Sequence, residues 1–177
     1  AIAGFSADLA DRVGALVDQR LFPLILGGDC SAVLGPMLAL RRRGRYGLAF
    51  LDGHDDYSYA KDYDTYLGRF VAAGLDLALL TGHGPNALCD IDGLRPYVAE
   101  TDVVHLGLQR EPEDLEYFDA AAFDDSPIVR HPADEIRDRG ADAVMKAARD
   151  HLDAQALDGF WIHLDVDVLH RDAMPAV

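Results

Sequence analysis

The chain has 177 residues, half of them hydrophobic, and carries 31 acidic against 16 basic residues, which gives a formal net charge of −15. A chain of this size and composition is expected to fold as one compact domain with a sizeable core. The acidic balance argues against nucleic acid and anionic membranes as partners, because both are bound through lysine and arginine contacts. It favours cationic ligands and metal ions, although many acidic proteins carry such charge for solubility alone.

Cysteine content and apolar stretches bear on the cellular compartment. Only Cys30 and Cys89 are present, so we expect no disulfide framework and a reducing environment. Apolar runs such as residues 48–51 are far too short to cross a bilayer, and no signal peptide precedes the first predicted helix. A cytoplasmic protein is therefore expected.

The first third of the chain predicts two helices and two strands. A helix is expected from Ser6, as its N-cap, to about Arg20. The apolar run 23–26, which ends in a Gly-Gly pair, predicts a buried strand and its turn. A second helix is expected from Ser31 to about Arg43, and residues 47–51 predict the next strand.

The rest of the chain continues the alternation. A helix is predicted at 75–81, strands at 103–108 and, more weakly, 128–129, a helix at 141–157 and a strand at 160–166. Strands that alternate with helices predict an α/β fold with a parallel sheet covered on both faces. The chain starts without methionine and stops just beyond the last predicted strand. We therefore expect residues 1–177 to be a single α/β domain that is incomplete at both ends.

Three predicted strands end in polar clusters. These are Gly27-Gly28-Asp29-Cys30-Ser31, Asp52-Gly53-His54-Asp55-Asp56 and Asp165-Val166-Asp167. In an open parallel sheet ligands bind beyond the carboxyl ends of the strands, so these clusters are expected to meet at one edge.

Metal ions are the simplest reason to gather so many carboxylates. Four aspartates meeting at one edge would repel one another and be costly to desolvate without cations. If both segments are extended, Asp52, His54 and Asp56 point to one side, and so do Asp165 and Asp167. Oxygen ligands with some imidazole suit Mn²⁺. Either motif alone is more often a turn or a solvated strand end, and the pair is what favours a metal site.

The order of these motifs resembles the ureohydrolase family of arginase, agmatinase and formimidoylglutamase. That family shows Gly-Gly-Asp-His, then Asp-Ala-His-x-Asp, then Asp-Val-Asp, and this chain is similar to a Gly-Gly-Asp-Cys branch of it. The resemblance implies a three-layer α/β/α sandwich with a parallel sheet, of which the C-terminal part is missing here. It also implies two Mn²⁺ ions, or one if Cys30 is not a ligand, a small cationic guanidino or amidino substrate, and a homo-oligomer.

The resemblance also assigns roles to single residues. Asp52 and Asp165 would bridge the two metals, and His54 and Asp167 would bind the second. Asp56 would complete the first site, where Cys30 stands in place of the family's histidine. A metal-bridging hydroxide, oriented by Asp56 as the catalytic residue, would hydrolyse a C–N bond of the substrate. The implied metal ligands are Cys30, Asp52, His54, Asp56, Asp165 and Asp167.

Departures from the family's pattern keep a second reading open. Cys30 is either a thiolate ligand, which favours Zn or Fe over Mn, or a buried thiol beside a weak site. The family's His-Gly before the next helix is Ala73-Gly74 here, and His170-Arg171 stands where the family has an acidic group. The family's distal glutamate would lie beyond Val177. The alternative is therefore a non-catalytic or truncated ureohydrolase-like protein with a partial metal site and a binding or assembly role.

Other polar residues have simpler readings. His105 and His163 lie in apolar strands and are expected to be core histidines, with His163 placed to support the metal ligands from behind. His83 is read as a loop histidine without function. The tyrosines that follow the second cluster either line a pocket wall or pack in a surface loop, and they are Tyr57, Tyr59, Tyr63 and Tyr66.

Overall fold

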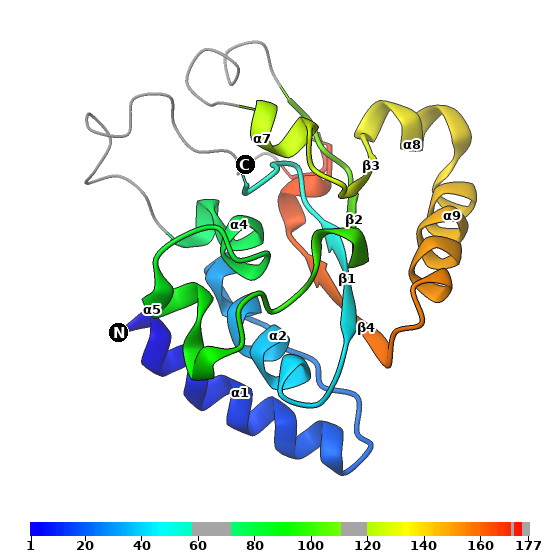
Figure 1. Ribbon diagram of the computed structural model, residues 1–177. Helices are drawn as coiled ribbons and strands as arrows, with labels where there is room; N and C mark the ends of the chain where they lie inside the picture. The colour runs from blue at the N-terminus through cyan, green and yellow to red at the C-terminus, as the bar shows by residue number, and fades with distance from the viewer. Residues whose placement is uncertain (58–71, 111–119, 171, 175–177) are drawn as a thin grey trace, which may run out of the picture.

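The computed structural model describes residues 1–57, 72–110, 120–170 and 172–174 (Figure 1). Within these residues one parallel sheet has the strand order β3-β2-β1-β4. Its strands are β1 Tyr46–Leu51, β2 Val103–Leu106, β3 Val129–His131 and β4 Gly159–Leu164. The parallel sheet that the alternating pattern predicts is confirmed.

Helices cover both faces of the sheet, as Figure 1 shows. One face carries α1 Ile2–Asp18, α2 Leu34–Arg41, α4 Asp76–Leu80 and α5 Asn86–Cys89. The other face carries α8 Ala133–Arg139 and α9 Ala141–Ala154. A short helix, α7 Ala121–Asp124, lies near the carboxyl end of β2. Single 3₁₀ turns connect these elements: η1 Cys30–Val33, η2 Ala72–Gly74, η3 Ile91–Gly93, η4 Glu100–Asp102 and η5 Val166–Val168.

Strand alternation divides the core into two layers. Leu48 and Phe50 of β1 face the larger layer, against α1, α2 and α4, whereas Ala49 faces the smaller one. The inner face of α9 closes the smaller layer with Val144, Ala148 and Leu152. Side chains that alternate between two apolar environments explain why β1 is apolar along its whole length. The result is a three-layer α/β/α arrangement.

Two predictions about the first part of the chain are wrong. The first helix begins at Ile2, and Ser6 is a fully buried residue within it instead of its cap. Residues 23–26 form no strand, because no neighbouring strand among the described residues offers them backbone hydrogen bonds. Phe22, Leu24 and Leu26 are 88%, 75% and 87% exposed.

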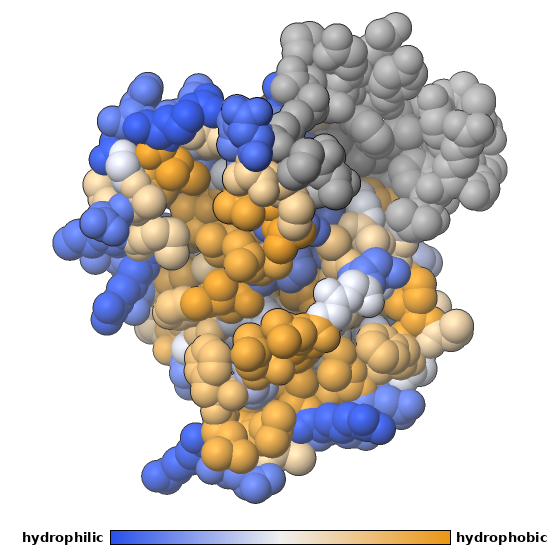
Figure 2. Space-filling view, turned by 180° about the vertical axis from the view of Figure 1, so that it is seen from behind, coloured by the Kyte–Doolittle hydropathy of each residue, from blue (hydrophilic) through white to orange (hydrophobic). Residues whose placement is uncertain are grey.

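The edge of the sheet at β4 is open among the described residues, since β4 pairs only with β1. Its outward side chains Phe160, Ile162 and Leu164 are 40%, 51% and 60% exposed. Figure 2 shows hydrophobic side chains gathered over the middle of the molecule when it is seen from behind. Of the helices that the structure describes, none combines the length and the apolar character needed to span a membrane.

Candidate metal centre

The carboxyl ends of β1 and β4 bring the two aspartate motifs together. The parallel register pairs Leu51 with Leu164, so Asp52 and Asp165 leave the sheet side by side. The backbone N–H of Asp165 donates to the carbonyl of Leu51 at 2.8 Å, which continues the ladder to this point. The predicted meeting of these two motifs at one edge is confirmed.

One cluster of donor atoms consists of Asp52, His54 and Asp167. A carboxylate oxygen of each aspartate and one imidazole nitrogen lie within 4.8 Å of one another. His54 Nδ1 donates to Asp167 Oδ2 at 2.7 Å, and the His54 backbone N–H donates to Asp52 Oδ1 at 2.7 Å. His54 is the exposed member, whereas Asp52 is fully buried.

Gly53 allows the two motifs to approach this closely. Its backbone N–H donates to Asp167 Oδ1 at 2.8 Å. A Cβ atom at this position would lie 2.8 Å from the backbone oxygen of Asp167, a distance that real Cβ atoms essentially never show. The lack of a side chain at residue 53 is therefore what permits Asp167 to approach His54.

A second cluster consists of Cys30, His163 and Asp165, whose donor atoms also lie within 4.8 Å of one another. The Cys30 thiol donates to Asp165 Oδ2 at 2.6 Å. The N-cap Asp29 holds Cys30 in place by accepting hydrogen bonds from the backbone and hydroxyl of Ser31. Ser31, the expected start of the second helix, thus lies inside the η1 turn, and Asp29 is the residue that caps this turn.

The expectation that Asp52, His54 and Asp56 share one side of an extended segment is wrong. Asp56 has a φ of 44°, so the chain turns after β1 instead of continuing as a strand. Asp165 and Asp167 also separate, because Val166–Val168 forms η5 and sends the first aspartate to Cys30 and the second to His54. Asp56 joins neither of the two clusters within the 4.8 Å limit.

Asp76, at the start of α4, is a buried carboxylate that sequence reasoning missed. It is 0% exposed, and neither of its oxygens has a hydrogen-bond partner among the described residues. Its helix is fixed to the second motif, since the backbone N–H of Ala78 donates to the carbonyl of Asp56 at 3.1 Å. A lone acidic residue in the apolar run 75–80 is the signal that was available in the sequence.

The pKa values of these groups show that burial first, and mutual repulsion second, opposes ionisation of the carboxyl groups. Burial and the neighbouring charge of Asp56 raise the pKa of Asp52 to about 9. Burial raises the pKa of Asp56 to about 7, and burial with the charges of Asp56 and Asp52 raises that of Asp76 well above its ordinary value. The hydrogen bond to Asp167 raises the pKa of His54 to about 9. Gathering these groups therefore costs free energy that nearby cations would offset.

The donor set fits divalent cations. Buried atoms without a hydrogen-bond partner among the described residues include Asp52 Oδ2, both oxygens of Asp76 and His163 Nε2. Unpaired buried polar atoms are rare, because each costs the desolvation of the group. Here they gather where parallel strands end, and carboxylate, imidazole and thiol are the groups that bind Mn²⁺, Zn²⁺ and related ions.

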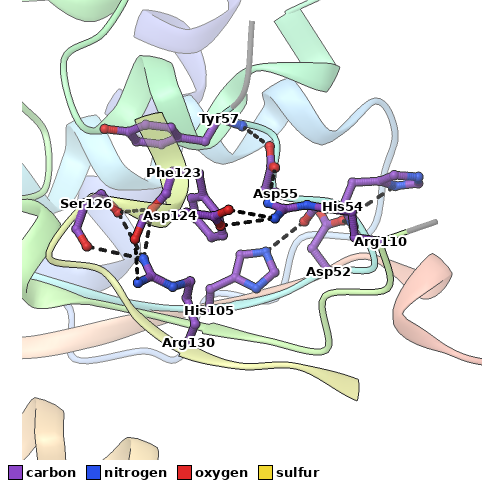
Figure 3. A network of polar contacts seen from close by, with 10 residues as sticks. All are labelled: Asp52, His54, Asp55, Tyr57, His105, Arg110, Phe123, Asp124, Ser126 and Arg130. Carbon is purple, nitrogen blue, oxygen red and sulfur yellow. Dashed lines mark hydrogen bonds and ion pairs between the residues drawn. The ribbon is translucent and has the colours of Figure 1, made fainter. Parts of the chain in front are cut away.

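Asp55 turns away from both clusters. Its carboxylate forms an ion pair with Arg110 at 3.0 Å, and Arg110 also binds Asp124 at 3.0 Å, as Figure 3 shows. His105 supports the same loop from below, since its Nε2 donates to the carbonyl of His54 at 2.7 Å. The prediction that His105 is a core histidine is confirmed, because its side chain is fully buried.

Tyr57, His83 and Glu100 form a hydrogen-bonded group near the loop that follows β1. Tyr57 is buried and its hydroxyl donates to Glu100, which also accepts from His83 Nε2 at 2.8 Å. His83 therefore belongs to a packed polar group, with its ring 5.3 Å from that of Tyr57. The predictions for Tyr59, Tyr63, Tyr66 and Arg171 fall outside the described residues.

Comparison with known proteins places this site in a family. The model of the family described as the arginase family matches residues 2–177. The chain belongs to the arginase family. This confirms the resemblance that the three motifs carry.

Arginases are among its relatives in both sequence and structure. The chain is 29% identical to an arginase of Bacillus caldovelox over 178 residues, which cover 100% of this chain and 56% of that relative. It is 26% identical to an arginase of Staphylococcus aureus, covering 91% of this chain and 50% of the relative. The solved structure of the Bacillus caldovelox arginase superposes with a TM-score of 0.82 at 26% identity, over 99% of this chain and 56% of that one.

The fold extends to a further family member at lower identity. The formimidoylglutamase of Bacillus subtilis superposes with a TM-score of 0.69 at 22% identity, over 96% of this chain and 47% of that one. The chain spans about half the length of the curated relatives it matches.

Proposed function

We propose that the protein is a metal-dependent hydrolase that cleaves a C–N bond in a small guanidino or amidino compound. The observation that carries this proposal is the convergence of two donor clusters at the ends of β1 and β4 in an arginase-family chain. Its expected ions are Mn²⁺ or a related divalent metal. The proposed ligands are those that the family motifs indicate: Cys30, Asp52, His54, Asp56, Asp165 and Asp167.

The chemistry of the reaction explains why metal ions suit this site. A guanidino carbon is a poor electrophile, and two divalent ions would lower the pKa of water enough to supply a nucleophile near neutral pH. Asp52 and Asp165 leave the sheet side by side, one in each cluster, and by the family's pattern would bind both ions, whereas His54 with Asp167 would hold one.

Asp56 is the proposed catalytic residue. By the resemblance to the family, its carboxylate would orient the attacking hydroxide by accepting a hydrogen bond from it. The surrounding carboxylates, within a chain of net charge −15, favour a cationic substrate. We further propose a cytoplasmic location, where Cys30 stays reduced, and a homo-oligomer like that expected of the family.

The test is urea release by purified protein supplied with Mn²⁺ and offered arginine, agmatine, guanidinobutyrate or hydroxyarginine. We expect turnover of at least one compound, and loss of at least a hundredfold in Asp167→Asn. The exposed Asp125→Asn serves as the matched control and should keep the parent rate. Absence of turnover across the panel in protein shown to contain metal would contradict the proposal.

The rival function is a non-catalytic relative that keeps a partial metal site. The position of Asp56 outside both clusters favours it. Metal analysis separates the two: two ions per chain favour hydrolysis, and none in a folded protein favours the rival.

A further inference from the structure

His163 is placed as a metal ligand by geometry that its sequence context hides. It lies on the same face of β4 as Asp165, and its ring stacks on Phe50 with centroids 4.8 Å apart. That stacking fixes the ring, while Nε2 stays buried and has no hydrogen-bond partner among the described residues. The histidine reaches Cys30 and Asp165 within the 4.8 Å that joins the second cluster.

Asp76 supplies an independent observation at the same place. Both of its oxygens are buried and unpartnered within the described part of the chain. Its charge acts on the Cys30 thiol as well as on Asp52 and Asp56, so the carboxylate lies near both clusters, although it joins neither within the 4.8 Å limit. α4 also contacts the η1 turn that carries Cys30. Asp76 is affected by other carboxylates, and no cationic side chain among the described residues pairs with it, so its burial is costly unless a metal ion lies nearby.

We propose that His163 and Asp76 complete a first metal site begun by Cys30 and Asp165, and that this site favours a softer ion such as Zn²⁺ or Co²⁺ over Mn²⁺. The inference rests on the proposed function only in assuming that metals occupy this edge of the sheet. The sulfur ligand distinguishes this site from the cluster of Asp52, His54 and Asp167, which offers carboxylate oxygens and one imidazole. Thiolate ligands select Zn²⁺ and similar ions, whereas Mn²⁺ prefers oxygen. On binding, the Cys30 sulfur gives its proton to solvent and bonds to the ion as a thiolate.

Cobalt provides the first test, because a thiolate bound to Co²⁺ gives a charge-transfer absorption in the near ultraviolet. We expect the purified protein to show this band when titrated with Co²⁺, Cys30→Ser to lose it, and Cys89→Ser to keep it. Cys89 is the matched control, since it is a buried cysteine in α5, away from the cluster. Persistence of the band in Cys30→Ser, or its absence in the parent protein, overturns the proposal.

Calorimetry with Zn²⁺ tests the other two residues. We expect His163→Gln and Asp76→Asn each to weaken Zn²⁺ binding at the site of Cys30 and Asp165 by tenfold or more. The affinity of the site formed by Asp52, His54 and Asp167 should not change. The control Asp102→Asn should lose stability and keep its metals, since Asp102 is bound to Arg45 at the opposite end of the sheet. Parent-like zinc binding in both site variants overturns the proposal.

X-ray absorption of the zinc-loaded parent protein needs no variant and therefore cannot fail through misfolding. We expect one sulfur scatterer in the shell of the first ion, and a shell of oxygen and nitrogen alone would contradict the site. These readouts are independent of turnover. A sulfur-ligated ion without urea release would contradict the proposed function alone, and urea release without sulfur ligation would contradict this inference alone.

Discussion

At the scale of single residues, Gly53 and His105 control the geometry of the loop that follows β1. Gly53 lets Asp167 approach, and His105 holds the carbonyl of His54 from below. Neither residue is a proposed ligand. Their substitution therefore tests whether the position of the loop, as well as its ligands, sets metal binding.

Gly53→Ala is predicted to separate the two aspartate motifs. The added Cβ would lie 2.8 Å from the Asp167 backbone oxygen, so the backbone must move at a cost of about 1–3 kcal/mol, the range for overpacking. We expect a lower free energy of unfolding in urea and weaker metal binding at Asp52, His54 and Asp167. Gly4→Ala in α1 is the control, because its Cβ would meet nothing within 4 Å. Equal metal affinity in Gly53→Ala and the parent would contradict the role of this close approach.

His105 predicts a dependence of stability on pH. Burial lowers the pKa of His105 from 6.5 to about 4. Between pH 6.5 and pH 4, His105 is therefore protonated in the unfolded chain and neutral in the folded protein. Its stabilising contribution is therefore present above pH 6.5 and is lost as the pH falls toward 4. We expect urea unfolding of the metal-free protein to show a shallower acid loss in His105→Gln than in the parent.

The matched variant for this experiment is His151→Gln on α9, which should follow the parent. Comparing variants isolates His105 from the buried carboxyl groups, whose raised pKa values act in the opposite direction. Identical pH profiles for His105→Gln and the parent would show that His105 does not titrate in this way.

At the scale of elements, regular periodicity was enough to predict most of the sheet and its main helices. β1 and α9 follow apolar patterns that their burial explains, whereas β4 is apolar although alternate side chains are exposed. The bounds of all three differ from the prediction by a few residues at most. The apolar run 23–26 misled because hydrophobicity does not reveal whether a partner strand exists. A strand needs a neighbour, and β4 does not provide one to this segment in the described residues.

Sequence patterns predicted the positions of candidate metal ligands only where these residues directly follow a strand. Asp52 and Asp165 were expected together, and the register of β1 and β4 places them so. His163 was expected to support the metal ligands from behind and not to join a cluster, and Asp76 was missed. Each lies in an apolar run, where a polar residue is easily taken as part of the core. The turn at Asp56 and the separation of Asp165 from Asp167 depend on backbone geometry that residue spacing does not show.

Among the described residues β4 pairs only with β1, and this open edge predicts self-association of the 177-residue chain. Exposed apolar side chains beside unpaired backbone groups favour pairing between edges. We expect Ile162→Lys to lower the average mass measured by light scattering at a fixed protein concentration, because a charge on the strand opposes such pairing. Met145→Lys, on exposed α9 surface, is the control and should behave as the parent. Unchanged association in Ile162→Lys would exclude the β4 edge as the surface through which the chains associate.

At the scale of the whole molecule, the arginase-family layers place two groups of side chains that could hold metal ions at one edge of the sheet. The chain spans about half the length of its curated relatives, yet both groups lie within it. Cys30, His163 and Asp165 form one group, and Asp52, His54 and Asp167 form the other. The proposed metal-dependent hydrolysis therefore depends on whether this edge of the sheet holds two ions.

A crystal structure grown with Co²⁺, with anomalous data collected at the cobalt absorption edge, tests this claim most directly. If both clusters bind metal, we expect two anomalous peaks per chain. One should lie at the Asp52, His54 and Asp167 cluster and the other at the Cys30, His163 and Asp165 cluster. Peaks confined to other acidic surfaces, or no peak at either cluster in well-ordered density, would contradict it.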